Sequence, residues 1–99
     1  MTANTNDSLN KYGVCLVAAD RGHVWVCEKA EVSDDFHWLT MTNAKIVRVW
    51  GTEQGLNSLV TGPRKQTVLD ATAPIVNVTM RAVLYIVPCQ AAGWAKTFK

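Results

Sequence analysis

Residues 12–29 read YGVCLVAADRGHVWVCEK, and this stretch decides the fold. Two runs rich in Val and other strand-forming residues flank the tripeptide Asp20-Arg21-Gly22. Gly22 can take the positive φ that the last position of a three-residue hairpin loop requires. The sequence therefore predicts a β-hairpin with a definite register. Its expected cross-strand pairs are Ala19–His23, Ala18–Val24, Val17–Trp25, Leu16–Val26, Cys15–Cys27 and Val14–Glu28.

Both faces of this predicted hairpin are apolar. One face carries Leu16, Val24 and Val26, and the opposite face carries Cys15, Val17, Trp25 and Cys27. An antiparallel sheet with one face in water normally shows polar residues on that face. We therefore expect something to cover both faces: closure of a barrel, a helix, or a second copy of the chain.

The rest of the chain indicates further strands and one short helix. Strands are expected at residues 36–41 and 44–50 around a turn at Thr42-Asn43, at residues 65–70, and at residues 75–87 as one bent strand or two short ones. Residues 30–35 are polar and are expected to form a connector. A helix is expected over residues 53–60, capped by Thr52 and ended by Gly62-Pro63. Together these elements predict a mainly β fold, a small antiparallel barrel or curled sheet of five to seven strands with one short helix.

Length and composition predict one domain. The chain has 99 residues, of which 48% are hydrophobic and 18% charged, which suits a single core and excludes disorder for most of the chain. Residues 1–10 are polar and are expected to form a flexible N-terminal tail. Residues 11–99 are expected to form the β-rich domain, ending in a C-terminal arm with Trp94 and Phe98 that docks on the body or on a neighbour.

Cellular location is predicted from what the sequence lacks. No apolar run approaches the ~18 residues of a membrane span, and residues 1–10 are too polar for a signal peptide. The chain has three cysteines, an odd number, which argues against a disulfide framework. These features predict a protein of the reducing cytoplasm with no membrane partner.

The sequence contains no pattern typical of catalysis or metal binding. His23 and Cys27 would lie roughly 13 Å apart along a strand at ~3.3 Å per residue, so one ion could not join them. No Ser or Cys lies in a glycine-framed turn beside a base, and no Gly-rich loop could bind a phosphate. The pair Asp34-Asp35 is interpreted as part of a solvated loop. We therefore expect no enzymatic activity, no metal and no cofactor, and we expect the thiols to be structural.

The four Trp residues are the strongest functional signal. A core this small cannot hold all of them centrally, so some should line an interface or a ligand pocket. Arg48, two residues before Trp50, could hold an anion or stack on a base, or it could simply extend into solvent at a sheet edge. The net charge of +2 and the single adjacent basic pair argue against a nucleic-acid partner. The candidate ligand-binding or interface residues are Trp25, Trp38, Arg48, Trp50, His23 and His37.

Several short motifs resemble one protein family. They are Gly22-His23-Val24, Asn43-Ala44-Lys45, Val49-Trp50-Gly51, Leu56…Leu59…Gly62 and Ile86-Val87-Pro88-Cys89. Over about Tyr12 to Trp94 the chain resembles an uncharacterised family of small proteins encoded by tailed bacteriophages and prophages. The resemblance implies a phage origin and supplies no site residues.

On this basis the predicted function is host-directed binding. We expect a non-enzymatic homo-oligomer in the host cytoplasm that inhibits a host process, antiviral defence above all. It would do so by sequestering a host defence protein or a small nucleotide signal. The alternative is a structural or assembly component of the virion, in which the covered faces pack against other chains.

Overall fold

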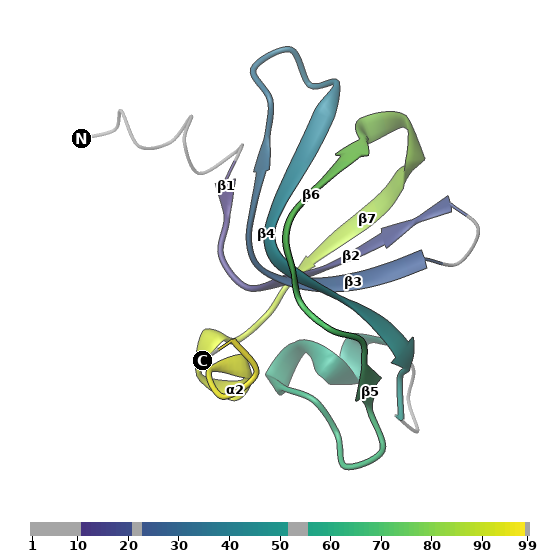
Figure 1. Cartoon of the computed structure of the whole chain (residues 1–99), viewed down its shortest axis with the longest axis vertical. Coiled ribbons are helices and arrows are strands. Elements are labelled where there is room, and N and C mark those ends of the chain that lie inside the picture. The colour runs from purple at the N-terminus through teal and green to yellow at the C-terminus, as the bar shows by residue number, and fades with distance from the viewer. Residues whose placement is uncertain (1–10, 21–22, 52–55, 99) are drawn as a thin grey trace.

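The computed structural model describes residues 11–20, 23–51 and 56–98. Within them the chain forms seven strands of one curled antiparallel sheet, together with three short helices (Figure 1). The strands are β1 (Lys11–Tyr12), β2 (Cys15–Ala19), β3 (His23–Val32), β4 (Trp38–Val49), β5 (Val68–Leu69), β6 (Ala73–Thr79) and β7 (Val83–Pro88). The helices are the 3₁₀ helices η2 (Leu56–Thr61) and η3 (Met80–Ala82) and the α-helix α2 (Ala91–Trp94). The tail predicted at residues 1–10 lies outside the described residues.

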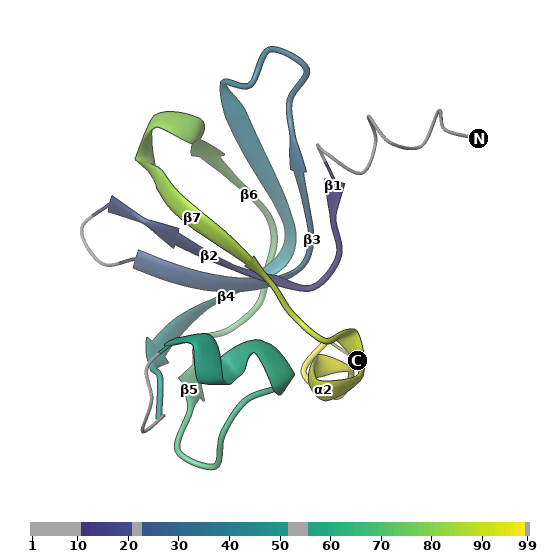
Figure 2. The same cartoon turned by 180° about the vertical axis from the view of Figure 1, so that it is seen from behind.

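The sheet curls without closing into a barrel. Its strand order is β5-β4-β3-β2-β7, with β1 paired to β3 and β6 paired to β4. The consecutive strands β6 and β7 are joined by η3, yet β6 pairs with β4 and β7 pairs with β2. In Figure 2, which shows the molecule from behind, β7 lies toward the viewer at the edge of the sheet beside β2, with η2 and α2 below it. The predicted fold class is confirmed in its curled-sheet form, and residues 75–87 form two strands rather than one.

The first hairpin has the predicted register in each of the five residue pairs that join β2 to β3, from Cys15–Cys27 to Ala19–His23. The hairpin loop residues Arg21 and Gly22 lie outside the described residues. Val14, predicted to face Glu28, precedes the strand β2 and is not among its ladder pairs.

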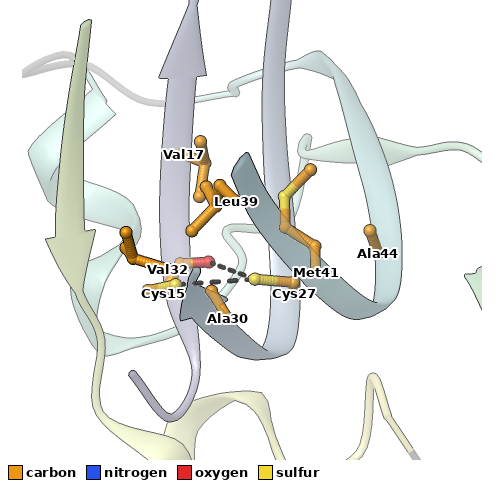
Figure 3. Close-up of a cluster of buried hydrophobic side chains, with 8 residues drawn as sticks. All are labelled: Cys15, Val17, Cys27, Ala30, Val32, Leu39, Met41 and Ala44. Atoms are coloured by element: carbon orange, nitrogen blue, oxygen red, sulfur yellow. Dashed lines mark hydrogen bonds between the residues drawn. The ribbon is translucent and has the colours of Figure 1, made fainter. Parts of the chain in front are cut away.

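Both faces of this hairpin are covered, as predicted, and the cover comes from the same chain. On one side the sheet curls over the hairpin; Figure 3 shows the resulting cluster of Cys15, Val17, Cys27, Ala30, Val32, Leu39, Met41 and Ala44. On the other side Leu59 of η2 and Trp94 of α2 cover Leu16 and Val26, and all four are fully buried. The apolar second face therefore requires no second copy of the chain.

Two predictions between residues 30 and 50 were wrong. The first half of the connector expected at residues 30–35 belongs to β3, which continues to Val32 and buries Ala30 and Val32. The turn expected at Thr42-Asn43 is absent, because β4 runs unbroken from Trp38 to Val49. The true turn joins β3 to β4 through Ser33–His37, where the Ser33 amide donates to the Trp38 carbonyl oxygen at 2.9 Å.

Asn43 bends β4 instead of ending it. Its φ of 53° lies in the left-handed region that Asn tolerates. Side chains on a regular strand alternate between faces, yet Met41 and Ala44, three residues apart, pack in the same cluster. The pairing register to β3 is unchanged on either side of Asn43, whose Nδ2 donates to Glu28 Oε1 at 2.7 Å. The alternation therefore reverses at Asn43, which lets both halves of β4 contribute to one core as the sheet curls.

The remaining elements are shorter than the sequence indicates. The helix expected at residues 53–60 is described only from Leu56, where it is the 3₁₀ helix η2 and buries Leu59. The strand expected at residues 65–70 is reduced to the two residues of β5. The C-terminal arm docks on the body, as predicted, because Trp94 is fully buried and its Nε1 donates to the Leu59 carbonyl oxygen at 2.8 Å.

Candidate functional site

The tip of the β3–β4 hairpin presents two aromatic side chains to solvent. Phe36 is 62% exposed and Trp38 is 52% exposed. Beside them lies η3, which follows β6 directly in the chain. Together these segments line a hollow of about 380 Å³. Its lining residues are Phe36, His37, Trp38, Thr79, Met80 and Arg81.

Hydrogen bonds from Ser33 and Asp35 hold this tip in place. The Ser33 hydroxyl donates to Asp35 Oδ1 at 2.5 Å and accepts from the backbone N–H groups of His37 and Trp38 at 3.2 and 3.1 Å. The His37 N–H also lies 3.1 Å from Asp35 Oδ1. The Met80 N–H donates to the His37 carbonyl oxygen at 2.8 Å, which ties η3 to the tip. The aromatic side chains are therefore presented on an ordered turn.

The same hydrogen bonds set the charge state of the tip. The Ser33 hydroxyl, and then the His37 N–H, stabilise the Asp35 carboxylate and hold the pKa of that carboxyl below its usual value. Asp35 Oδ2 lies 3.2 Å from His37 Nδ1, so the carboxylate also faces the imidazole. Among the residues that line this hollow, Arg81 is the Lys or Arg side chain, so it is the group suited to an anionic ligand.

Phe36 has an unusual backbone conformation for its side chain. Its φ of 60° lies in the left-handed region, which bulky residues rarely adopt because Cβ approaches the backbone too closely. Residues held in this way cluster at ligand-binding and active sites. Here the conformation leaves the Phe36 ring largely in water, so burial of the ring does not account for it.

The outer face of the sheet continues the hollow along β4. Trp38, Thr40 and Asn77 line a second hollow of about 370 Å³. A third hollow of about 430 Å³ includes Thr40, Thr42, Lys11 and Lys29 among its lining residues. Trp38 borders the first two hollows and Thr40 borders the last two, so the three hollows are neighbours along β4. Together they are called the track.

The six residues predicted from the sequence fall into two groups at opposite ends of β4. His37 and Trp38 belong to the aromatic tip. His23 and Trp25 lie near the other end, with their rings stacked at a centroid distance of 5.7 Å and an interplanar angle of 18°. Arg48 and Trp50 follow at that same end, so the six residues do not form a single pocket.

Arg48 and Trp50 have partners of their own. The Arg48 guanidinium lies 2.6 Å from Asp70 Oδ1, which compensates its charge. The Trp50 carbonyl oxygen accepts a 2.6 Å hydrogen bond from Thr67, while 40% of the residue surface is exposed. These contacts favour the interpretation of Arg48 as a residue at a sheet edge rather than as an anion-binding residue.

The sequence interpretation missed Phe36 and Arg81. Phe36 precedes the predicted pair His37 and Trp38, so an aromatic run of three was visible. Arg81 carries no such signal, because its proximity to the tip depends on β6 pairing with β4, in which Thr79 stands opposite Trp38.

The thiols are poor nucleophiles in this fold. The Cys15 and Cys27 sulfur atoms lie 3.5 Å apart and both residues are fully buried (Figure 3). The hydrogen bond with Cys27, followed by burial, raises the pKa of Cys15 far above its ordinary value. Burial raises the pKa of Cys89 to about 11. In the described part of the chain, no three His, Cys, Asp or Glu side chains gather as a metal site would need.

None of the helices in the described ranges is long and apolar enough to cross a membrane. No protein-family model and no curated protein matches the chain.

Proposed function

We propose that this protein is a non-enzymatic binding protein that sequesters a nucleotide signal in the hollow at the β3–β4 tip. One observation carries the proposal: Phe36 and Trp38 are exposed on an ordered turn beside Arg81. Aromatic rings stack on nucleobases, and a guanidinium is well suited to a phosphate. A hollow of about 380 Å³ also falls in the range of small-ligand sites.

The biological setting of the proposal comes from the sequence. The motifs that resemble those of phage proteins favour a role in the host cytoplasm, where sequestering a nucleotide signal would inhibit antiviral defence. Homo-oligomerisation remains a prediction. The hairpin that motivated it is covered on both faces within one chain, so this part of the proposal needs its own measurement.

A protein target is the second candidate. Exposed aromatic residues on a rigid turn are also typical of binding hot spots at protein interfaces. Phe36, at 62% exposure, is the observation that favours this candidate, because it is more open than a residue that lines an enclosed pocket. Nucleotide binding is preferred because Arg81 and Thr79 supply polar groups suited to a phosphate and a ribose.

The test is isothermal titration calorimetry, in which adenosine monophosphate or guanosine monophosphate is titrated into the protein. We expect Trp38→Ala and Arg81→Ala each to weaken binding about tenfold or more, since stacking is worth ~1–3 kcal/mol per base and 1.4 kcal/mol is a factor of ten. Trp50→Ala and Arg64→Ala are the matched controls, because both residues are exposed and lie outside the hollow.

Two results would contradict the proposal. If neither nucleotide binds, or if the control variants weaken binding as much as the tip variants, the hollow does not hold a nucleotide. Heating the complex should release the nucleotide unchanged, as judged by mass spectrometry. Recovery of a cleaved nucleotide would show an enzyme instead of a binding protein.

A further inference from the structure

We infer that the bound nucleotide has at least two nucleotide units, and that the track along the outer face of β4 holds the second unit. This inference rests on the proposed function, because it extends the same site. The observation behind it is that two further hollows follow the hollow at the tip along β4. The neighbouring hollows share Trp38 and Thr40 as lining residues, and they continue to Lys11 and Lys29.

The middle of the track is suited to a ribose. Thr40 stands opposite Asn77 of β6 on one side and opposite Glu31 of β3 on the other. The Thr40 hydroxyl donates to Asn77 Oδ1 at 2.7 Å. Because this bond uses the Thr40 hydroxyl proton and one lone pair of Asn77 Oδ1, the Thr40 lone pairs and the Asn77 amide protons remain to hydrogen-bond ribose hydroxyls. These groups would therefore bind the ribose of the second nucleotide unit.

The charges of the track suit a phosphate at each end. Arg81 lies at the hollow beside the tip, and Lys11 and Lys29 lie at the far hollow. Glu31 also lines the far hollow, but Lys11 stands directly opposite it in the β1–β3 register and offsets its charge. The positive charge of Lys29 is therefore left uncompensated in the far hollow, which favours a second anionic group there.

The two cationic ends of the track are too far apart for one phosphate to contact both. From Trp38 to Thr42 the strand advances four residues, or roughly 13 Å at ~3.3 Å per residue. Arg81 lies at one end of the track and Lys29 at the other. A mononucleotide carries one phosphate and can contact only one of these ends, whereas a 5′-phosphorylated linked pair carries two phosphates.

The experiment compares adenosine monophosphate with the 5′-phosphorylated dinucleotide pApA by calorimetry on the full chain. We expect pApA to bind at least tenfold more tightly than the mononucleotide. Lys29→Ala should lower the affinity for pApA to that for the mononucleotide. The control Lys65→Ala, an exposed lysine outside the track, should retain the tenfold preference for pApA.

The outcomes separate this inference from the proposed function. If the mononucleotide binds and pApA binds no more tightly, the second unit is not held and the inference is overturned while the proposed function stands. If Lys29→Ala keeps the full preference for pApA, the track is not the second subsite. If neither ligand binds, the proposed function fails and this inference fails with it.

Discussion

Asn43 lies at the point where β4 bends within the curled sheet. Its φ of 53° and its hydrogen bond to Glu28 coincide with the point where the side-chain alternation of the strand reverses. Without that reversal, either Met41 or Ala44 would turn away from the core. Because Asn43 tolerates the left-handed region, residues of β4 on both sides of it can pack in the same hydrophobic cluster.

Replacement of Asn43 by Ala should destabilise the protein by about 1–3 kcal/mol. The left-handed conformation costs an ordinary residue roughly 1–2 kcal/mol, which Asn offsets in part through local hydrogen bonds of its side chain and Ala does not, and loss of the hydrogen bond to Glu28 adds about 1 kcal/mol. Asn43→Gly keeps the left-handed conformation accessible, so this variant should lose only the contribution of the hydrogen bond to Glu28. Urea denaturation would measure both changes. A cost for Asn43→Ala no larger than that of the neighbouring control Thr42→Ala would contradict this role.

The sequence reveals the conformation of Asn43 but not its consequence. Asn after Thr42 is typical of a tight turn, because local propensity cannot distinguish a turn from a bend within a strand. The deciding contact comes from Glu28, fifteen residues earlier in the chain. Local sequence also fails to predict the burial of Ala30 and Val32. Their neighbours are polar, so the segment was expected to be a connector, although both side chains face the core.

At the level of elements, η2 and α2 are packed through glycines. A Cβ at Gly93 would lie only 1.8 Å from the Thr61 carbonyl oxygen, and a Cβ at Gly62 would lie 2.6 Å from the Gly93 carbonyl oxygen. This close approach lets the Trp94 side chain reach the Leu59 carbonyl oxygen. The C-terminal arm therefore docks by backbone proximity as well as by burial of Trp94.

Gly93→Ala should destabilise the protein by about 1–3 kcal/mol, the usual cost of overpacking, because α2 must move away from η2. Gly13→Ala is the matched control, since a Cβ at Gly13 would have nothing within 4 Å. We expect this control to be neutral or slightly stabilising. Thermal denaturation of the two variants would compare them. Equal melting temperatures would show that the two helices are not in close contact.

The elements of the candidate site were only partly predictable. His37 and Trp38 were identified because aromatic residues beside a histidine are a local signal. Arg81 became part of the site through the pairing of β6 with β4, a contact between residues some forty positions apart. The prediction of one pocket with Arg48 and Trp50 did not allow for the length of β4, which places these residues at its other end.

At the scale of the whole molecule, two hydrophobic clusters lie on opposite faces of the first hairpin. Cys15 and Cys27 belong to the cluster inside the curl, and Leu16 and Val26 belong to the cluster under η2 and α2. These side chains alternate along the same two strands. Because the strands are shared, loss of packing on one face should loosen the other, and the chain should unfold as one cooperative unit.

Trp94→Ala tests this coupling. Removal of a fully buried Trp should cost about 3–5 kcal/mol and, if unfolding is cooperative, should expose Cys15 and Cys27 on the opposite face. Since 1.4 kcal/mol is a factor of ten, alkylation of both thiols by iodoacetamide should accelerate at least a hundredfold, as followed by mass spectrometry. Trp50→Ala, which removes an exposed ring, should leave the rate unchanged. If Trp94→Ala lowers the melting temperature while both thiols stay protected as in the unaltered protein, the two clusters unfold independently.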